Sequence, residues 1–224
     1  MIILTGPCGG CILRRMMRIG ILGGTFDPVH LGHLIPAQYA CHHLRLDRLL
    51  LVPSAVPVHR PRHTPASPED RLRMCRLAAA SIPPFSVSDV EVARPDPSYT
   101  VLTLRQFRRE FGRDADLCLL VGEDNLPLLH TWRHIEEILE LAHLVVLPRP
   151  VEEPMDLGEV REALGEAVVQ RLLGSRVPSP YIPISATQIR AAVHAGRSIA
   201  GLVPESVAAY IAEAGLYADP PPSP

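Results

Sequence analysis

The chain has 224 residues, of which 47% are hydrophobic, and a formal net charge of −2. This length predicts one domain of α/β size with a substantial core, and the near-neutral charge argues against a general nucleic-acid binder, which usually carries a basic excess. All 22 basic residues are arginine, which excludes any mechanism that depends on a lysine nucleophile or Schiff base.

Neither a membrane span nor an export signal is visible. No apolar run approaches the roughly 18 residues of a transmembrane helix, and residues 1–17 make a poor secretory signal. Five cysteines, an odd number, do not resemble a disulfide framework, and Cys8 and Cys11 form a lone C-x-x-C without a flanking strand pattern. We expect buried free thiols at the cysteines in apolar-periodic segments, Cys41, Cys75 and Cys118. These features predict a cytoplasmic protein.

Apolar runs of strand length alternate with helix-period segments, the pattern of a parallel sheet wrapped by helices. The predicted strands are 18–22, 48–52, 85–92, 117–121, 143–147 and a short one at 181–184. The predicted helices are 33–44, one starting at Ser67, 100–111, one within 151–174, 185–195 and 204–214. This order predicts an α/β fold, a Rossmann-like doubly wound sheet with a small C-terminal helical part, in which ligands bind at the carboxyl ends of the strands.

The domain organisation follows from these boundaries. We expect a single domain over residues 18–218, preceded by an extension, residues 1–17, whose role the sequence does not indicate. Residues 219–224 are too short and too rich in proline to pack, which predicts a disordered tail.

The first predicted strand leads into the string G-G-T-F-D-P-V-H-L-G-H over residues 23–33. Two consecutive glycines let the backbone turn sharply and approach a ligand, and Thr25 offers a hydroxyl and an amide to a phosphate. His30 and His33 lie three residues apart at the mouth of a helix, where free amides and the helix dipole favour anions. The string therefore favours a phosphate site over a metal pair, for which no third ligand has a suitable spacing.

A second element, I-S-A-T-Q-I-R over residues 184–190, opens a late helix. Ser185 is a natural N-cap and Thr187 lies in the first turn, so hydroxyls and free amides form an anion cradle. Arg190 comes little more than one turn later and can reach back to clamp phosphate oxygens. Alone, the element is typical of an ordinary capped amphipathic helix; beside the first one it indicates phosphate binding.

Both elements resemble those of the nucleotidyltransferase superfamily, which includes adenylyl- and cytidylyltransferases and shares H-x-G-H with class I aminoacyl-tRNA synthetases. The longer string at 23–33 is closer to that of the bacterial nicotinate mononucleotide adenylyltransferases. Weaker similarity to that family covers residues 18–217 and includes V-P-S-A-V-P-V-H-R at 52–60, P-S-Y-T at 97–100, G-E-D-N-L at 122–126, Trp132, R-P at 149–150 and G-L-Y at 215–217. Val58 and Leu102 depart from the family pattern, which usually has proline and a polar residue there.

The resemblance implies an activity. ATP would transfer its adenylyl group to nicotinic acid mononucleotide, giving nicotinic acid adenine dinucleotide and pyrophosphate in NAD biosynthesis. The mononucleotide phosphate would attack the α-phosphorus in line, without a covalent intermediate, so catalysis would be positioning and charge stabilisation. Magnesium would be the cofactor, bound through the ATP phosphates and not by protein ligands.

The resemblance also implies residue roles. His33 would act on the α-phosphate with support from His30, and Arg190 would hold the β- and γ-phosphates. The other implied ATP and phosphate contacts are Gly23, Gly24, Thr25, Phe26, Ser185 and Thr187. The implied acceptor contacts are Tyr99, Thr100, Trp132, Asp124, His59, Arg60 and Arg149.

Several alternatives remain open at this point. The same chemistry could serve nicotinamide mononucleotide, phosphopantetheine or a cytidylyl transfer. A non-catalytic nucleotide sensor is a second class, against which the intact His30, His33 and Arg190 argue, because a sensor need not keep transition-state groups. A metal-binding module would use the four histidines His30, His33, His42 and His43. The oligomeric state cannot be read from the sequence.

Overall fold

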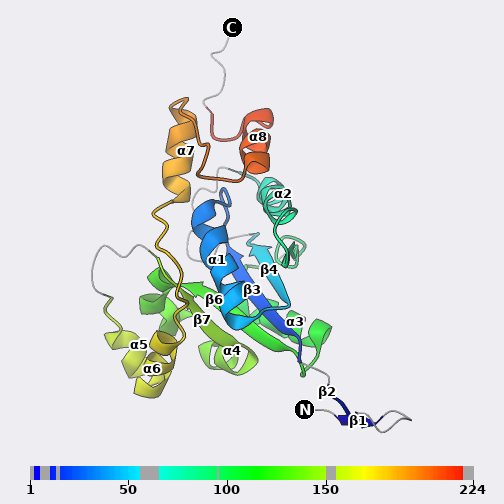
Figure 1. The fold of residues 1–224 in the computed structure, drawn as a ribbon. Coiled ribbons are helices and arrows are strands. Elements are labelled where there is room, and N and C mark those ends of the chain that lie inside the picture. Colours follow the sequence, from blue (N-terminus) through cyan, green and yellow to red (C-terminus); the bar gives the residue numbers. More distant parts are fainter. Residues whose placement is uncertain are drawn as a thin grey trace.

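The computed structural model describes residues 3–5, 11–13, 16–55, 66–94, 96–149 and 155–218. Its centre is a five-stranded parallel sheet with the order β5-β4-β3-β6-β7 (Figure 1). The strands are β3 (Arg18–Gly24), β4 (Arg48–Pro53), β5 (Phe85–Val87), β6 (Asp116–Gly122) and β7 (His143–Leu147). The predicted Rossmann-like doubly wound sheet is confirmed.

The strand order reverses beside the first strand of this sheet. The chain builds β3, β4 and β5 in one direction and then returns to the other side of β3 with β6 and β7. Leu22 of β3 therefore pairs with Leu51 on one side and with Leu120 on the other. Such a reversal separates the loops that leave neighbouring strands and opens a crevice at their carboxyl ends.

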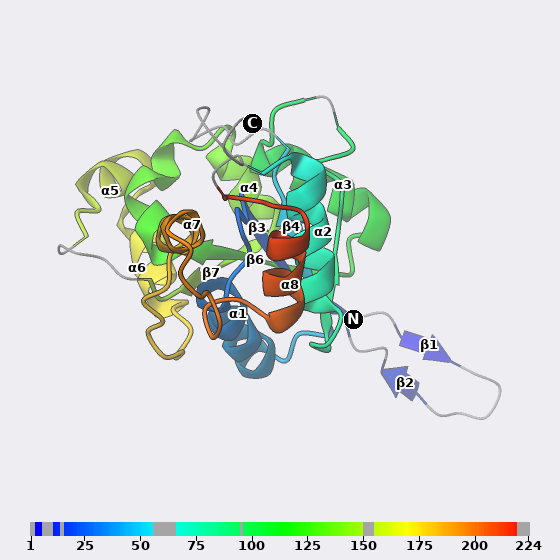
Figure 2. The ribbon, with the colours of Figure 1, turned by 90° about the horizontal axis from the view of Figure 1, so that it is seen from above.

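Helices cover both faces of the sheet (Figure 2). One face is covered by α1 (Leu31–Leu44), α2 (Pro68–Ala79), α7 (Ala186–His194) and α8 (Glu205–Glu213). The other face is covered by α3 (Thr100–Phe111), the 3-10 helix η1 (Glu123–Thr131), α4 (Ile135–Leu141), α5 (Gly158–Leu164) and α6 (Glu166–Gly174). Leu49 and Leu51 of β4 pack toward the first layer, whereas Leu50 and Val52 pack toward the second. Two covered faces explain why the strands are continuous aliphatic runs.

Three of the predicted elements were wrong. The strand expected at 85–92 ends at Val87, because the chain turns over residues 90–93. Residues 181–184 form no strand; prolines at 180 and 183 remove the backbone donors that a sheet needs. The region 151–174 holds two helices, α5 and α6, and not one. Both η1 and α4 were missed, since a seven-residue helix and a 3-10 helix show too little periodicity.

A separate antiparallel pair lies near the N-terminus, formed by β1 (Ile3–Thr5) and β2 (Cys11–Leu13). Cys11 begins β2, so the expectation of no strand beside the C-x-x-C was wrong; Cys8 and the expected tail, 219–224, lie outside the described residues. Within the described part of the chain, no helix has the length and apolarity to cross a membrane.

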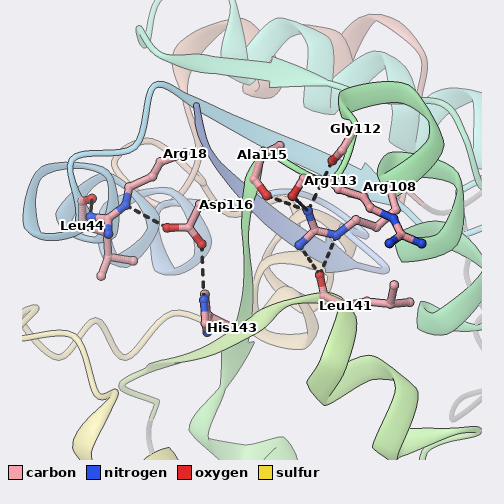
Figure 3. Close-up of polar contacts among 9 residues, drawn as sticks. All are labelled: Arg18, Leu44, Arg108, Gly112, Arg113, Ala115, Asp116, Leu141 and His143. Carbon is pink, nitrogen blue, oxygen red and sulfur yellow. Dashed lines mark hydrogen bonds and ion pairs between the residues drawn. The ribbon is translucent and has the colours of Figure 1, made fainter. Parts of the chain in front are cut away.

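Arginines join neighbouring elements at the amino ends of the strands (Figure 3). Nε and Nη2 of Arg108 donate to the carbonyl oxygen of Leu141 at 3.0 and 2.6 Å, and Nη1 donates to that of Ala115 at 2.6 Å. Leu141 ends α4 and Ala115 precedes β6, so one guanidinium donates hydrogen bonds both to the end of a helix and to the start of a strand. Beside it, Arg18 Nε donates to Asp116 at 2.9 Å.

Replacing Arg108 with methionine keeps the aliphatic stem and removes these donors. A single hydrogen bond from a charged donor contributes about 1.5–3 kcal/mol, and each kcal/mol corresponds to roughly 2–4 °C in a chain of this size. We therefore expect Arg108→Met to lower the melting temperature by roughly 5 °C or more. Thermal unfolding followed by circular dichroism measures this. Arg109→Met, at an exposed position on the same helix, is the matched control and should change little. Equal losses in the two variants would contradict the assignment.

Candidate active site

A cavity of about 1030 Å³ lies at the carboxyl ends of the strands, where the strand order reverses. Its wall includes the strand-end residues Gly24, Val52, Gly122 and Leu147. All of the site residues expected from the sequence that fall in the described part of the chain line it: Gly23, Gly24, Thr25, Phe26, His30, His33, Tyr99, Thr100, Asp124, Trp132, Arg149, Ser185, Thr187 and Arg190. His59 and Arg60, like Val58, lie outside the described residues.

The turn that follows β3, residues 25–27, has an unusual backbone. Phe26 has a φ of 51°, in the left-handed region that non-glycine residues rarely adopt. The Phe26 ring is buried and meets the His33 ring edge-on, with 5.1 Å between centroids and 77° between planes. A Cβ at position 24 would lie 3.1 Å from the Phe26 ring, so a larger residue there would press on this ring. The turn thus places an aromatic support against His33.

The geometry of the two histidines defines the tautomer of His33. The backbone N–H of His30 donates to Nδ1 of His33 at 3.3 Å, so Nδ1 carries no proton and the neutral ring carries it on Nε2. The two rings lie 3.7 Å apart, centroid to centroid. Burial, followed by the charge of Arg149, lowers the pKa of His30 to about 3. Burial, His30 and Arg149 also lower the pKa of His33 well below its usual value, so both imidazoles are neutral at pH 7.

Gly32 brings the two sequence motifs into contact, the first motif being residues 23–33 and the second being residues 184–190. A Cβ at this position would lie 2.9 Å from the carbonyl oxygen of Ile184 and 3.0 Å from the His30 ring. Glycine therefore lets the backbone before α7 pack against the start of α1. There Ser185 Oγ accepts the N–H of Gln188 at 3.2 Å, which is the N-cap that the sequence predicts.

Arg190 also joins the two motifs. Its Nη1 donates to the carbonyl oxygen of Asp27 at 2.7 Å, and its Nη2 donates to Thr187 Oγ1 at 3.3 Å. A guanidinium has five N–H donors, so these bonds leave capacity for phosphate oxygens. The residue has a structural contact with the first motif that its sequence position did not suggest.

Sequence reasoning missed Arg71 of α2, which is completely buried behind the turn at 25–27. Its Nη1 donates to the carbonyl oxygen of Thr25 at 2.6 Å and its Nη2 donates to that of Ala55 at 3.1 Å. Burial lowers the pKa of Arg71, and the negative charge of the nearby Asp27 partly offsets this shift. Nothing local distinguishes this arginine, because arginines on amphipathic helices usually lie in solvent.

Aromatic side chains line another part of the cavity wall. Tyr99 is the N-cap of α3, Thr100 is its first residue, and Trp132 follows η1. The guanidinium carbon of Arg133 lies 4.7 Å from the centroid of the Tyr99 ring, a cation–π contact. Arg133, which belongs to neither motif, thus adds a positive charge beside this aromatic wall.

A buried carboxyl group supports the segment before α3. Glu91 lines the cavity and accepts a hydrogen bond from Thr103 Oγ1 at 2.6 Å, and its pKa is raised by burial. Ser98 Oγ accepts the backbone N–H of Ala55 at 3.0 Å, which links this segment to the loop after β4. Sequence reasoning missed Glu91, because no local pattern indicated that it would be buried. Leu102, the departure from the family pattern, packs against the core and does not line the cavity.

Two charged residues lie over the end of β6. The side chains of Asp124 and Arg149 both contact the position where a Cβ of Gly122 would stand. The neighbouring Glu123 is buried and accepts a hydrogen bond from Arg176 Nη2 at 2.8 Å, which anchors the start of η1. Among the residues that the structure describes, no three histidine, cysteine, aspartate or glutamate side chains converge to hold a metal ion.

Comparison with known proteins first gives the class. A family model described as cytidylyltransferase-like matches residues 21–192, a span that contains both motifs and most of the cavity wall. The match covers more than half of the chain, so the chain belongs to this class of nucleotidyltransferase.

The relatives then give the family. A "probable nicotinate-nucleotide adenylyltransferase" of Pseudomonas fluorescens is 43% identical over 212 residues, covering 91% of this chain and 98% of the relative. One of the same name from Roseiflexus castenholzii is 44% identical over 200 residues, covering 89% and 98%. The chain belongs to the family of nicotinate-nucleotide adenylyltransferases.

A solved structure agrees with the fold. Plasmodium falciparum nicotinic acid mononucleotide adenylyltransferase, in structures complexed with APC and with NaAD, superposes with a TM-score of 0.66. The match covers 90% of this chain and 97% of that one, at 15% identity.

The neutral histidines predict an acid-sensitive fold. Between pH 6.5 and about pH 3, His30 stays neutral in the folded protein but gains a proton in the unfolded chain. The free energy of unfolding should therefore fall as the pH drops below 6.5, by up to about 1.4 kcal/mol per pH unit for such a group. In urea denaturation at several pH values, His30→Asn should lose part of this slope. His43→Asn, exposed on the same helix, should keep it. An unchanged slope in His30→Asn would contradict the assignment.

Proposed function

We propose that this protein transfers the adenylyl group of ATP to nicotinic acid mononucleotide, producing nicotinic acid adenine dinucleotide and pyrophosphate in NAD biosynthesis. The observation that carries the proposal is that the wall of one cavity combines both phosphate motifs with the aromatic segment at Tyr99, Thr100 and Trp132. Membership of the nicotinate-nucleotide adenylyltransferase family supports it.

The first motif would stabilise the transition state at the α-phosphate. His33 is assigned to this group, since its neutral ring has an Nε2–H to donate to a phosphoryl oxygen as charge develops. His30 and Thr25 would support the phosphates from the same loop, where Gly23, Gly24 and Phe26 shape the approach. Arg190, with Ser185 and Thr187, would hold the β- and γ-phosphates.

The reaction needs neither a general base nor a covalent intermediate. A phosphate oxygen of the mononucleotide forms a bond to the α-phosphorus, the bond from that phosphorus to the β-bridging oxygen breaks, and pyrophosphate leaves with the electron pair. The low pKa values of His30 and His33 make both poor proton acceptors, which suits their assignment as hydrogen-bond donors. Catalysis is then positioning and electrostatic stabilisation.

Magnesium is the proposed cofactor, held through phosphate oxygens and water. The two motifs supply hydroxyls, imidazoles and a guanidinium, and the one carboxylate in the first motif, Asp27, already accepts a hydrogen bond from Tyr217. These groups fit phosphates that bring their own cation better than a dedicated metal cage. When bound, the ion would neutralise part of the triphosphate charge.

The aromatic wall would receive the acceptor. Tyr99 and Trp132, with the free backbone amides where α3 begins at Thr100, suit a flat ring that bears a carboxylate. Arg149 would contact the mononucleotide, and Asp124 would meet a ribose hydroxyl. His59 and Arg60 are proposed as further contacts. The buried free thiols of Cys41, Cys75 and Cys118 support residence in the reducing cytoplasm.

The direct test is pyrophosphate release from ATP and Mg²⁺ with nicotinic acid mononucleotide or its amide as acceptor. We expect a much higher kcat/KM for the acid, because the proposed ring pocket carries positive charge and free amides. A preference for the amide, or turnover only with phosphopantetheine, would reject the acceptor assignment and leave the phosphate chemistry intact. No turnover with any acceptor would favour a nucleotide sensor.

The role of His33 has its own test. Loss of one donor to a developing oxyanion typically costs about 2.7–4 kcal/mol, so His33→Ala should lower kcat roughly a hundred- to a thousandfold. Circular dichroism should show an intact fold, and His43→Ala on the exposed side of α1 should retain wild-type turnover. Near wild-type turnover in His33→Ala would refute the role.

A further inference from the structure

Three side chains from distant parts of the chain converge on the turn at residues 25–27. Arg71 of α2 donates to the carbonyl oxygen of Thr25, and Arg190 of α7 donates to that of Asp27. The third is Tyr217, which follows α8; its hydroxyl donates to Oδ1 of Asp27 at 2.7 Å. The last described residues of the chain thereby reach the loop that carries the first motif.

We propose that Tyr217 is a positioning residue of the active site, which holds the turn that supports His33 through its hydrogen bond to Asp27. The proposal rests on the proposed function of the cavity, because it names a residue that prepares that site. Tyr217 itself does not line the cavity, so it would act through Asp27 and not on substrate.

The carboxylate of Asp27 gives this bond its importance. Asp27 is only 4% exposed, and a buried carboxylate is costly unless donors satisfy it. Burial and the charge of Asp27 raise the pKa of Tyr217, which keeps its hydroxyl protonated as a donor. The neighbouring Arg71 and Arg190 donate to carbonyl oxygens of the same turn, whereas the hydroxyl of Tyr217 donates to the carboxylate itself.

The backbone is in an unusual conformation at both ends of the hydrogen bond between Tyr217 and Asp27. Phe26, beside Asp27, has a φ of 51°, and Tyr217 has a φ of 64°. Non-glycine residues in the left-handed region persist only where the surrounding structure holds them, and they cluster at functional sites. The hydrogen bond joins two segments that are both held in this conformation.

The consequence for the site runs through Phe26. Its ring lies edge-on against the His33 ring at 5.1 Å, so a relaxed turn would move the support of the imidazole. A misplacement of about 1 Å, caused by a mutation away from the chemistry, can cost about a hundredfold in rate. Loss of the Tyr217 hydroxyl should therefore lower kcat beyond what its effect on folding explains.

The chain offers a matched control for this experiment. Tyr210, on α8, donates its hydroxyl to Oδ1 of Asp70 at 2.7 Å, the same type of bond at the same length. Asp70 lies in the first turn of α2 and does not line the cavity. Tyr217→Phe and Tyr210→Phe each remove one hydroxyl donor from a carboxylate, but only the first touches the turn at 25–27.

The two variants would be compared in steady-state kinetics, thermal unfolding and ¹⁵N NMR of the His33 imidazole in the substrate-free protein. We expect Tyr217→Phe to lower kcat by about tenfold or more, with KM for the acceptor within about twofold of wild type. Its melting temperature should fall further than that of Tyr210→Phe, because the carboxylate that it leaves without this donor is buried. In assays well below both melting temperatures, the kcat of Tyr210→Phe should remain close to wild type. The ¹⁵N signals should show the Nε2–H tautomer in wild type and Tyr210→Phe, and a shift away from it in Tyr217→Phe.

Equal kcat values in the two variants, or unchanged His33 signals in Tyr217→Phe, would overturn the proposal. A kcat loss that merely follows the melting temperature in both variants would do the same, because it would indicate a structural role only. The NMR measurement contains no substrate. If the wild-type protein failed to adenylylate nicotinic acid mononucleotide, the proposed function would fall while the positioning role was still decided by the spectra.

Discussion

The turn after β3 presents two backbone carbonyl groups and the carboxylate of the buried Asp27, and side chains from around the cavity donate hydrogen bonds to all three. Unpaired buried polar groups of this kind are costly, so each requires a donor from elsewhere in the fold. Arg71, Arg190 and Tyr217 provide these donors from α2, α7 and the segment after α8. The helices on this face of the sheet are therefore attached to the turn at residues 25–27 by the same bonds that shape it.

This arrangement divides the electrostatic roles at the site. The chain has no lysine, so its fixed positive charges come from arginine, which stays charged even when burial lowers its pKa. The two histidines of the first motif are neutral, because they lie in a poorly hydrated site beside Arg149. Arginines can thus attract and hold anionic groups while a neutral imidazole donates a directed hydrogen bond. Such a donor costs little reorganisation when charge develops on a bound phosphoryl group.

The two edges of the sheet serve different purposes. At the amino edge, Arg108 and the pair Arg18–Asp116 join helix ends and strand starts. At the carboxyl ends of the strands, the loops around the point where the strand order reverses form the cavity. This division follows from the parallel arrangement of the strands. All strands run in the same direction, so the loops that follow their carboxyl ends lie together, and ligands bind there.

Local sequence patterns determined the parallel sheet and most helix boundaries, and they predicted the two phosphate-binding motifs. Aliphatic runs such as β4, the hydroxyl caps at Ser67 and Ser185, and the stop at Gly112 each act within a few residues, so the printed sequence is enough to predict them. Likewise, the spacing of His30 and His33 in a glycine-rich string already indicated phosphate chemistry.

Tertiary structure alone decided which side chains hold that string in place. Arg71 and Thr25 are 46 residues apart, and Tyr217 and Asp27 are 190 apart. No periodicity links such distant positions, and an arginine or tyrosine on an amphipathic segment is expected at the surface. For the same reason, the sequence did not reveal that Glu91 is buried or that β5 ends at Val87. Burial and strand pairing depend on which segments the folded chain brings together.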